Sequence, residues 1–177
     1  MDKLTLDRIE LLHPKIKEEV RSIYIDEVCK SLTGRAICRF AYTLRTFAEQ
    51  DALFAQGRTR LFDVQGKRLG VITQARGGQS FHNYGLAFDI VLLTDNDRNG
   101  SFESASWDNI RDFDNDKQSD WMEVVNIFKK HGYTWGGDFK RFKDAPHFEK
   151  TFGFTHQQLL RLHNNKNFIP GTTYVNI

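Results

Sequence analysis

The fold is decided by the stretch "LAFDIVLL", Leu86 to Leu93, in which seven of eight residues are apolar. A short apolar run that follows a turn signal, here the "NYG" that ends at Gly85, predicts a buried β-strand. Asp89 lies in the middle of this run. Burial of an ionised carboxylate costs free energy unless a cation or several hydrogen bonds compensate it. The rest of the sequence must therefore supply a partner for Asp89.

Helical and strand-like segments are mixed along the chain without a regular alternation of strand and helix. Apolar spacings of three and four, together with capping signals, predict helices at residues 13–34, 46–57, 120–132 and 155–163. Alternating or continuous apolar residues predict strands at residues 35–45, 86–93, 133–139 and 146–151. This mixture favours an α+β fold with a small mixed or antiparallel sheet flanked by helices.

Two of these predictions concern individual side chains. The alternation in residues 35–45 places Tyr42 on the same face as Phe40. At the start of the third predicted helix, Asp120 and Glu123 have the spacing of a capping pair. The polar segment that precedes this helix is expected to be a long surface loop.

The overall composition narrows the class of protein. A chain of 177 residues with 40% hydrophobic residues predicts one domain, residues 1–177, with a hydrophobic core. A net charge of +2 without a basic block gives no support for nucleic-acid binding, and no apolar run is long enough to span a membrane. The first residues contain no apolar segment typical of a secretory signal. Cys29 and Cys38 are interpreted as two buried thiols, and their pairing is left open.

Six histidines are available as partners for Asp89. His13 is expected at the surface near a helix end, and His131 at a helix C-terminus, where an imidazolium interacts well with the dipole. His156 and His163 fall on a polar helix face. The remaining candidates are His82 and His147.

Both remaining histidines can approach Asp89. His82 lies seven residues before it, and the intervening turn at Gly85 can bend the chain back. His147 opens a predicted strand, where it shares a face with Glu149. Two histidines and one aspartate are ligand types of a catalytic zinc site with one open position. The residue types equally allow Asp89 to accept backbone hydrogen bonds or to pair with an arginine.

Three further residues have types that suit hydrolysis. Asp144, three residues before His147, could accept a proton from a metal-bound water, or could simply form a turn before Pro146. Arg45, between a strand and a helix, could stabilise an oxyanion or form a surface ion pair. Ser80 could hydrogen-bond substrate, or be an ordinary polar loop residue.

Two motifs resemble those of a known family. The stretch "SFHNYGLAFD" fits the pattern S-x-H-x-x-G-x-A-x-D at every fixed position, and "WGGDFKRFKDAPHFE" supplies a third-ligand motif. Together they are similar to the zinc peptidases of the bacterial cell wall, which comprise D-alanyl-D-alanine carboxypeptidases and dipeptidases and L-alanyl-D-glutamate endopeptidases. The last group, which includes phage endolysins, is most similar in "RTFAEQDALFAQGRT" and "WGGDF". The resemblance covers residues 9–152 and implies the fold shared by hedgehog proteins and DD-peptidases, with a short helix and tail over residues 153–177.

The resemblance implies a site and a reaction. One zinc ion per chain would be held by His82, Asp89 and His147. Asp144 would be the general base, Arg45 would polarise the scissile carbonyl and Ser80 would line the substrate site. The reaction would be hydrolysis of the peptidoglycan stem peptide, at the L-Ala–D-Glu bond. Dipeptidases of the family usually have Glu followed by Trp-His, whereas this chain has Asp144 and "APH", which favours the endopeptidases.

Alternatives from the same and from another class stay open. A D,D-carboxypeptidase or dipeptidase could use the same residues, and a zinc-stabilised binding module without activity could share the fold. The presence of Asp144 and Arg45 argues against the binding module. The expected partner is the stem peptide, bound by a monomer, with no nucleic acid and no membrane span. Action on the wall without a visible signal implies phage-type release or non-classical export.

A second metal motif is weaker. The stretch "DNDRNG", Asp95 to Gly100, matches the opening of an EF-hand calcium loop. The twelfth position, where that loop needs a bidentate glutamate, is Ser106. We therefore expect an Asp/Asn-rich turn here rather than a calcium site.

Overall fold

The computed structural model describes all residues 1–177, and the chain divides into two compact units. The first unit comprises residues 1–43 and 86–150, and the second comprises residues 44–85 and 151–177. The single catalytic domain expected over residues 1–177 stays a prediction.

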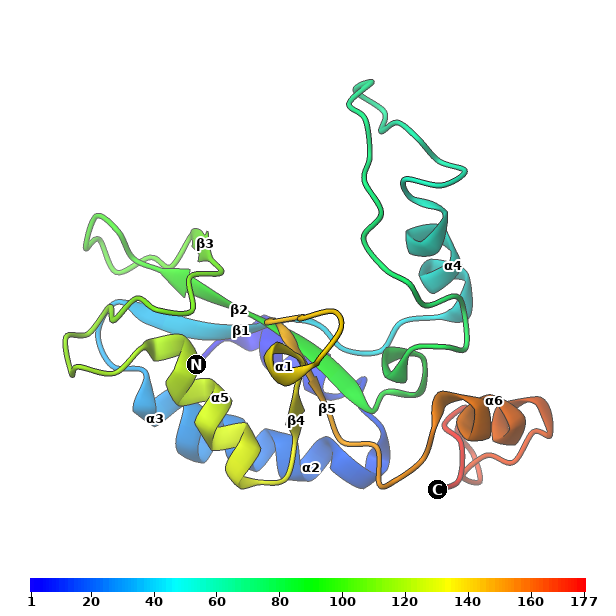
Figure 1. Cartoon of the computed structure of the whole chain (residues 1–177). Helices are drawn as coiled ribbons and strands as arrows, with labels where there is room; N and C mark the ends of the chain where they lie inside the picture. Colours follow the sequence, from blue (N-terminus) through cyan, green and yellow to red (C-terminus); the bar gives the residue numbers. More distant parts are fainter. The chain divides into compact units, whose positions relative to one another are not determined.

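The first unit contains an antiparallel sheet of five strands, which confirms the α+β fold (Figure 1). The strands are β1 (Ala36–Tyr42), β2 (Ala87–Thr94), β3 (Ser104–Ser106), β4 (Thr134–Trp135) and β5 (His147–Glu149). Their order is β1-β2-β5-β4, and β3 also pairs with β2. The central strand β2 is the apolar run that contains Asp89, and it pairs with three other strands. The short strand β3 was not predicted, because it interrupts a segment that reads as a polar loop.

Helices of the first unit accompany this sheet (Figure 1). They are α1 (Lys3–Ile9), α2 (Pro14–Ile23), the π-helical turn η1 (Tyr24–Val28), α3 (Cys29–Ser31) and α5 (Asp120–Lys130). The helix predicted at residues 13–34 is confirmed as the run from α2 to α3, with η1 in its middle. Helix α1 was not predicted. No helix of the structure combines the length and the apolar character needed to cross a membrane.

The core of the first unit is aromatic and lies on one face of the sheet. The ring of Phe88 in β2 stacks on Phe40 at 4.4 Å between centroids and on Phe148 at 5.4 Å. Phe128 of α5 packs against the same ring at 4.8 Å. Each such buried side chain contributes roughly 1.5–3 kcal/mol relative to its exposed state. Because side chains alternate along a strand, Asp89 points to the opposite face.

The strand predicted at residues 35–45 ends earlier, at Tyr42. Tyr42 is 58% exposed, whereas the preceding core residue of this strand, Phe40, is fully buried. The pairing of β1 with β2 shifts its register between these two residues, which is a β-bulge. The bulge breaks the two-residue alternation, so the prediction that Tyr42 shares the face of Phe40 was wrong.

Two predictions about polar side chains were also wrong. Ser119, rather than Asp120, caps helix α5, and its hydroxyl accepts a hydrogen bond from the backbone N–H of Met122. His13 is 1% exposed instead of lying at the surface. It is the N-cap of α2, and its Nδ1 accepts from the backbone N–H of Lys15 at 3.1 Å. An imidazole can thus replace the hydroxyl or carboxylate that the usual capping signals contain.

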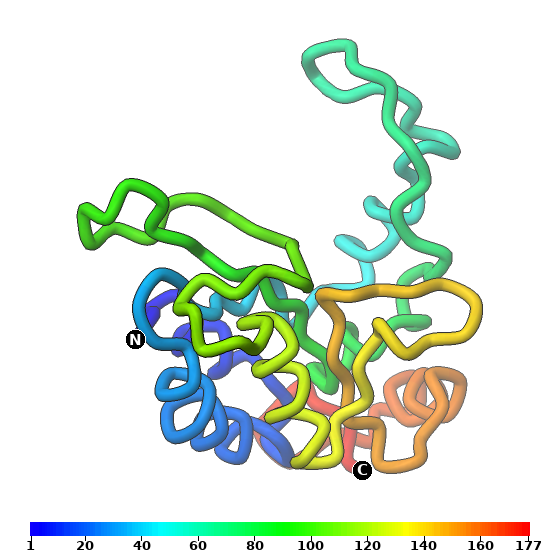
Figure 2. Tube along the Cα trace, turned by 60° about the vertical axis from the view of Figure 1, so that its left-hand side comes forward, coloured from blue at the N-terminus to red at the C-terminus, as the bar shows by residue number.

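The second unit contains three helical segments, namely α4 (Phe47–Ala55), η2 (Phe81–Tyr84) and α6 (His156–Asn164). The capping signals that predicted α4 and α6 are both present as capping boxes, formed by Thr46 with Glu49 and by Thr155 with Gln158. In Figure 2 the segment between α4 and η2 runs out from α4 and folds back along itself. An antiparallel bridge between Phe62 and Arg68 ties its two halves together.

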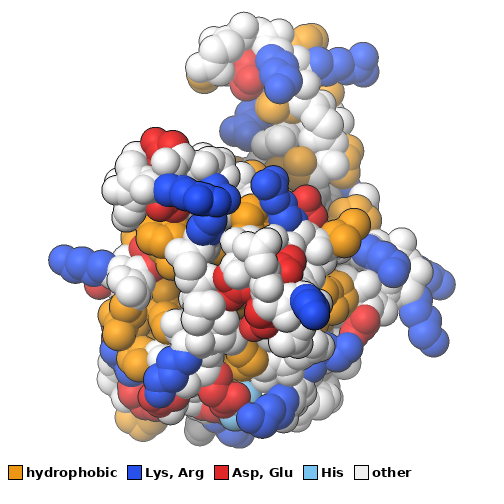
Figure 3. Space-filling model, turned by 90° about the vertical axis from the view of Figure 1, so that its left-hand side faces the viewer, with side chains coloured by type: hydrophobic (Ala, Val, Ile, Leu, Met, Phe, Trp, Pro, Cys, Tyr) orange, Lys and Arg blue, Asp and Glu red, His pale blue; other side chains and the backbone are white.

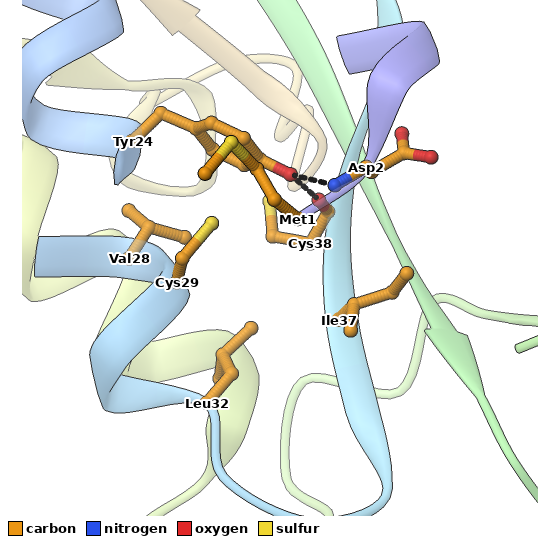
Figure 4. Close-up of a pocket in the computed structure, with 8 residues that line it drawn as sticks. All are labelled: Met1, Asp2, Tyr24, Val28, Cys29, Leu32, Ile37 and Cys38. Carbon is orange, nitrogen blue, oxygen red and sulfur yellow. Dashed lines mark hydrogen bonds between the residues drawn. The ribbon is translucent and has the colours of Figure 1, made fainter. Parts of the chain in front are cut away.

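Both cysteines are free thiols. They line a small cavity of about 40 Å³ in the first unit, together with Tyr24 (Figure 4). Burial raises the pKa of the thiols of Cys29 and Cys38 above the ordinary value. The two side chains therefore behave as protonated apolar groups.

Candidate metal centre and active site

The carboxylate of Asp89 lies beside an imidazole on the face of the sheet opposite the aromatic core. Asp89 and His147 are directly paired residues of β2 and β5. The Nδ1 atom of His147 is 3.2 Å from Oδ1 of Asp89. This pairing follows from the strand register, because Phe88 and Phe148, one position away, occupy the core side as a second cross-strand pair.

A second acidic residue, Glu149, contacts the other side of the same imidazole. Glu149 lies two residues after His147, on the same face of β5, and its Oε2 is 3.0 Å from Nε2 of the ring. Burial alone would lower the pKa of His147, but hydrogen bonds to Asp89 and Glu149 raise it to about 9. The carboxylates thus create a site that favours positive charge. In a neutral imidazole, an N–H donated to Glu149 leaves the lone pair of Nδ1 on the side of Asp89.

His82 completes a group of three possible metal ligands. It is 3% exposed and lies in η2, which Gly85 at φ 67° connects to β2. His82, Asp89 and His147 each offer one ligand atom, and these atoms lie within 4.8 Å of one another. Two imidazoles and one carboxylate form a donor set that fits zinc and leaves room for a further ligand. The imidazoles of His82 and His147 are therefore the partners that the carboxylate of Asp89 requires.

Asp144 is held next to His147 by a tightly bonded turn. The backbone N–H of His147 donates to the carbonyl of Asp144 at 3.1 Å, and the N–H of Asp144 donates to the carbonyl of Gly136 at 2.9 Å. The next two carbonyls also accept hydrogen bonds. The indole N–H of Trp135 donates to the carbonyl of Ala145, and the backbone N–H of Ile90 donates to the carbonyl of Pro146. The turn interpretation of Asp144 is correct for its backbone, and this turn places the residue immediately beside His147.

Gly136 is required by this turn. A Cβ atom at position 136 would lie 2.3 Å from the carbonyl oxygen of Asp144 and 3.0 Å from Cβ of His147. Any larger residue would therefore push Asp144 or His147 away. Gly136 is the first glycine of the "WGGDF" motif, and this close packing explains why a glycine is needed there.

Arg45 and Ser80 are positioned within the second unit by one amide side chain. Asn83 donates from Nδ2 to the carbonyl of Arg45 at 2.9 Å, and its Oδ1 accepts from the N–H of Ser80 at 3.3 Å. The N–H of Arg45 donates to the carbonyl of His82 at 3.0 Å. The guanidinium of Arg45 donates to Oε1 of Gln50, which is 1% exposed. Neither Asn83 nor Gln50 was a candidate from sequence, because an amide gives no pattern of its own.

Comparison with known proteins agrees with these observations. A sequence model of the D-alanyl-D-alanine carboxypeptidase family, Peptidase_M15_4, matches residues 73–150, which include all three possible metal ligands and Asp144. The peptidoglycan L-alanyl-D-glutamate endopeptidase CwlK of Bacillus subtilis (strain 168) is 41% identical over 138 residues, which cover 78% of this chain and 72% of CwlK. The chain belongs to the M15 peptidase family.

The fold is also that of a solved relative. The crystal structure of the Serratia marcescens L-Ala D-Glu endopeptidase ChiX superposes with a TM-score of 0.53 and 20% sequence identity. The match covers 86% of this chain and 90% of ChiX. At this level of identity the likeness concerns the fold, and it confirms the DD-peptidase-like α+β architecture of this M15 peptidase.

The close packing at Gly136 gives a first prediction. We expect Gly136→Ala to lower both divalent-metal affinity and peptidase turnover by about 100-fold, because its Cβ displaces Asp144 and His147 from their places. Metal affinity is measured by competition with a chelator, and the thermal unfolding midpoint shows whether the variant folds. Gly70→Ala is the matched control, since a Cβ there meets nothing within 4 Å. Wild-type affinity in Gly136→Ala would contradict the prediction.

The contact between Glu149 and His147 gives a second prediction. Glu149→Gln keeps an oxygen acceptor but loses the negative charge that orients and polarises the imidazole. We expect metal affinity to fall roughly 10- to 100-fold, the usual effect of removing such an outer carboxylate. Glu103→Gln, which changes an exposed glutamate elsewhere in the first unit, serves as the control. Equal affinities in the two variants would show that Glu149 does not influence the metal.

Proposed function

We propose that this M15 peptidase is a zinc-dependent endopeptidase that cleaves the L-Ala–D-Glu bond of the peptidoglycan stem peptide. The main support for this proposal is a His-Asp-His group in a chain that is 41% identical to the L-alanyl-D-glutamate endopeptidase CwlK. The pairing of Asp89 with His147 inside the sheet supports a rigid site rather than a flexible surface one.

The proposed zinc ligands are His82, Asp89 and His147. Zinc bound there would supply Lewis acidity and would lower the pKa of a bound water to about 7. The protein's own contribution is orientation. The strand register fixes Asp89 and His147 relative to each other, and Glu149 fixes the ring of His147 through Nε2.

Asp144 is the proposed general base. Its carboxylate would accept a proton from the attacking water and then return that proton to the leaving amine. Two features of the turn support this role. Asp144 is only half-buried, so its carboxylate can take part in proton exchange, and its backbone is fixed by bonds to Gly136 and His147.

Arg45 and Ser80 are proposed to contact the substrate. The guanidinium of Arg45 would donate to the scissile carbonyl oxygen and stabilise the negative charge that develops there. Its contact with the buried Gln50 supports this role, because it restricts the side chain before substrate binds. Ser80 would hydrogen-bond the stem peptide from the segment that Asn83 organises.

The choice of bond separates this proposal from the runner-up. The family model is described as D-alanyl-D-alanine carboxypeptidase, so removal of a terminal D-Ala is the specific alternative. The endopeptidase is favoured because CwlK is matched over most of its length and over 78% of this chain. The endolysin assignment, the monomeric state and the route to the wall stay predictions.

Digestion of purified peptidoglycan tests the function directly. We expect mass analysis of the zinc-loaded protein's products to show stem peptides with a new amino-terminal D-Glu, and a chelator to abolish their release. Release of free D-Ala instead would establish the carboxypeptidase. Stable binding to the wall without any product would establish a non-catalytic binding module.

The assignment of the base is tested by Asp144→Asn. We expect kcat to fall by about 10²- to 10⁴-fold, the contribution typical of general acid–base catalysis, while zinc content is unchanged because Asp144 is not a proposed ligand. Asp138→Asn removes an exposed carboxylate from the same segment and should leave kcat unchanged. Full turnover in Asp144→Asn would require another base.

A further inference from the structure

A second group of acidic side chains lies in the loop that leads into α5, within the first unit. Asp112, Asp114 and Asp116 offer oxygens within 4.8 Å of one another, and so do Asp114, Asp120 and Glu123. The two groups share Asp114, so five carboxylates surround one region. Figure 2 shows the preceding segment leaving β2 and returning to the start of α5. Figure 3 views this side of the molecule and shows acidic side chains gathered on the surface.

Buried oxygens without a partner point to a missing ligand in this group. Asp120 is completely buried, and its Oδ1 has no hydrogen-bond partner. Its other oxygen accepts from the N–H of Phe113 at 2.7 Å, so the carboxylate is fixed in place. Oε2 of Glu123 is also buried without a partner. A buried carboxylate oxygen without a donor is unfavourable, and a cation is the group that would satisfy two of them together.

The spacing of these residues identifies the class of cation. In "DFDNDKQSDWME", Asp112 to Glu123, acidic residues occupy positions 1, 3, 5, 9 and 12. These are the side-chain positions of a calcium-binding EF-hand loop, whose position 7 contributes a backbone carbonyl and whose position 12 is a bidentate glutamate. Position 6, normally glycine, is Lys117, and its backbone nevertheless adopts a left-handed φ of 77°. Helix α5 begins at Asp120, as the exiting helix of such a loop does.

The backbone of the loop is already folded around its first acidic residue. Asp112 accepts from the N–H of Asn115 at 2.6 Å and from that of Lys117 at 2.9 Å. Asp114 accepts from the N–H and the hydroxyl of Thr33, at 3.2 and 2.7 Å, which links the loop to the connection between α3 and β1. The ligand positions are therefore arranged before any cation binds.

We propose that residues 112–123 form a calcium site, in which carboxylates of Asp112, Asp114, Asp116, Asp120 and Glu123 and the carbonyl of Gln118 hold one Ca²⁺. Oxygen-only donors select calcium over zinc, because hard cations prefer oxygen. The bound ion joins the loop to the first turn of α5 and, through Asp114, to Thr33. It is a structural ion of the first unit, and the proposal is independent of the peptidase function.

The electrostatics of the loop support this assignment. Burial and the negative charges of the neighbouring aspartates raise the pKa of Glu123 to about 7. Burial raises the pKa of Asp120 as well. The carboxylates thus repel one another, and a divalent cation relieves the repulsion.

The loop that begins with "DNDRNG", Asp95 to Gly100, differs from this one. The carboxylate of Asp95 accepts from the N–H groups of Asn99 and Gly100, at 3.1 and 3.0 Å. Position 12 of the loop that begins at Asp95 is Ser106, which lies in β3 and has no carboxylate. This agrees with its interpretation as a turn, and it provides a matched control.

Calcium titration of the full, zinc-loaded chain tests the proposal. With CaCl₂ alone as the probe, we expect calorimetry to show one ion per chain with a Kd on the order of 10⁻⁴ M, and the unfolding midpoint to rise with calcium. Glu123→Gln should weaken binding by at least about tenfold, since it removes the bidentate ligand. Asp97→Asn, in the control loop, should bind calcium like the wild type.

The unfolding temperature without calcium shows whether Glu123 acts as a calcium ligand or only stabilises the fold. Without calcium, Glu123→Gln should unfold at the same temperature as the wild type or higher, because it removes one of five repelling charges. Asp116→Asn, at an exposed position 5, gives the same test if Glu123→Gln does not fold. Absence of binding at roughly 10 mM calcium, about 100 times the expected Kd, overturns the proposal. The proposal is also overturned if Asp97→Asn abolishes calcium binding while Glu123→Gln and Asp116→Asn retain it.

Discussion

The side chain of Asp89 emerges from a strand whose other face is the aromatic core, and the candidate metal centre depends on this constraint. Phe88 and Phe148 face each other across β2 and β5 in the core, which forces Asp89 and His147 to face each other on the opposite side. A slip of one residue in this register would send every side chain to the wrong face. The same packing that stabilises the sheet thus determines the distance between Asp89 and His147, two of the three proposed ligands.

A short turn extends this rigidity to the proposed base. The carbonyls of Asp144, Ala145 and Pro146 each accept a hydrogen bond from a different part of the first unit. The turn is closed against Gly136, where no Cβ fits. A general base accepts a proton in one step and donates it in the next, so its carboxylate must be held in the same position in both steps. The bonded turn supplies that precision, while the carboxylate of Asp144 stays half-buried.

Sequence patterns predicted the features that follow from local rules. The strand around Asp89, the helix from residue 14 to 31 and two capping boxes were correct, because apolar periodicity and capping are local properties. The bulge at Tyr42 and the burial of His13 were missed, because both depend on neighbours that are distant in sequence. Glu149 was placed on the correct face, yet its contact with His147 became evident only once the rotamers were known.

The two candidate metal sites show how donor chemistry can assign different ions to one chain. Around Asp89 the carboxylate is joined by imidazoles, whose nitrogen donors suit zinc. Around Asp114 every donor is an oxygen, and Asp120 is buried without a cationic partner for one of its oxygens. A zinc ion gains little from the second set, and a calcium ion gains little from the first. The two proposed sites would therefore select different ions, because their ligand atoms differ even though both sites are negatively charged.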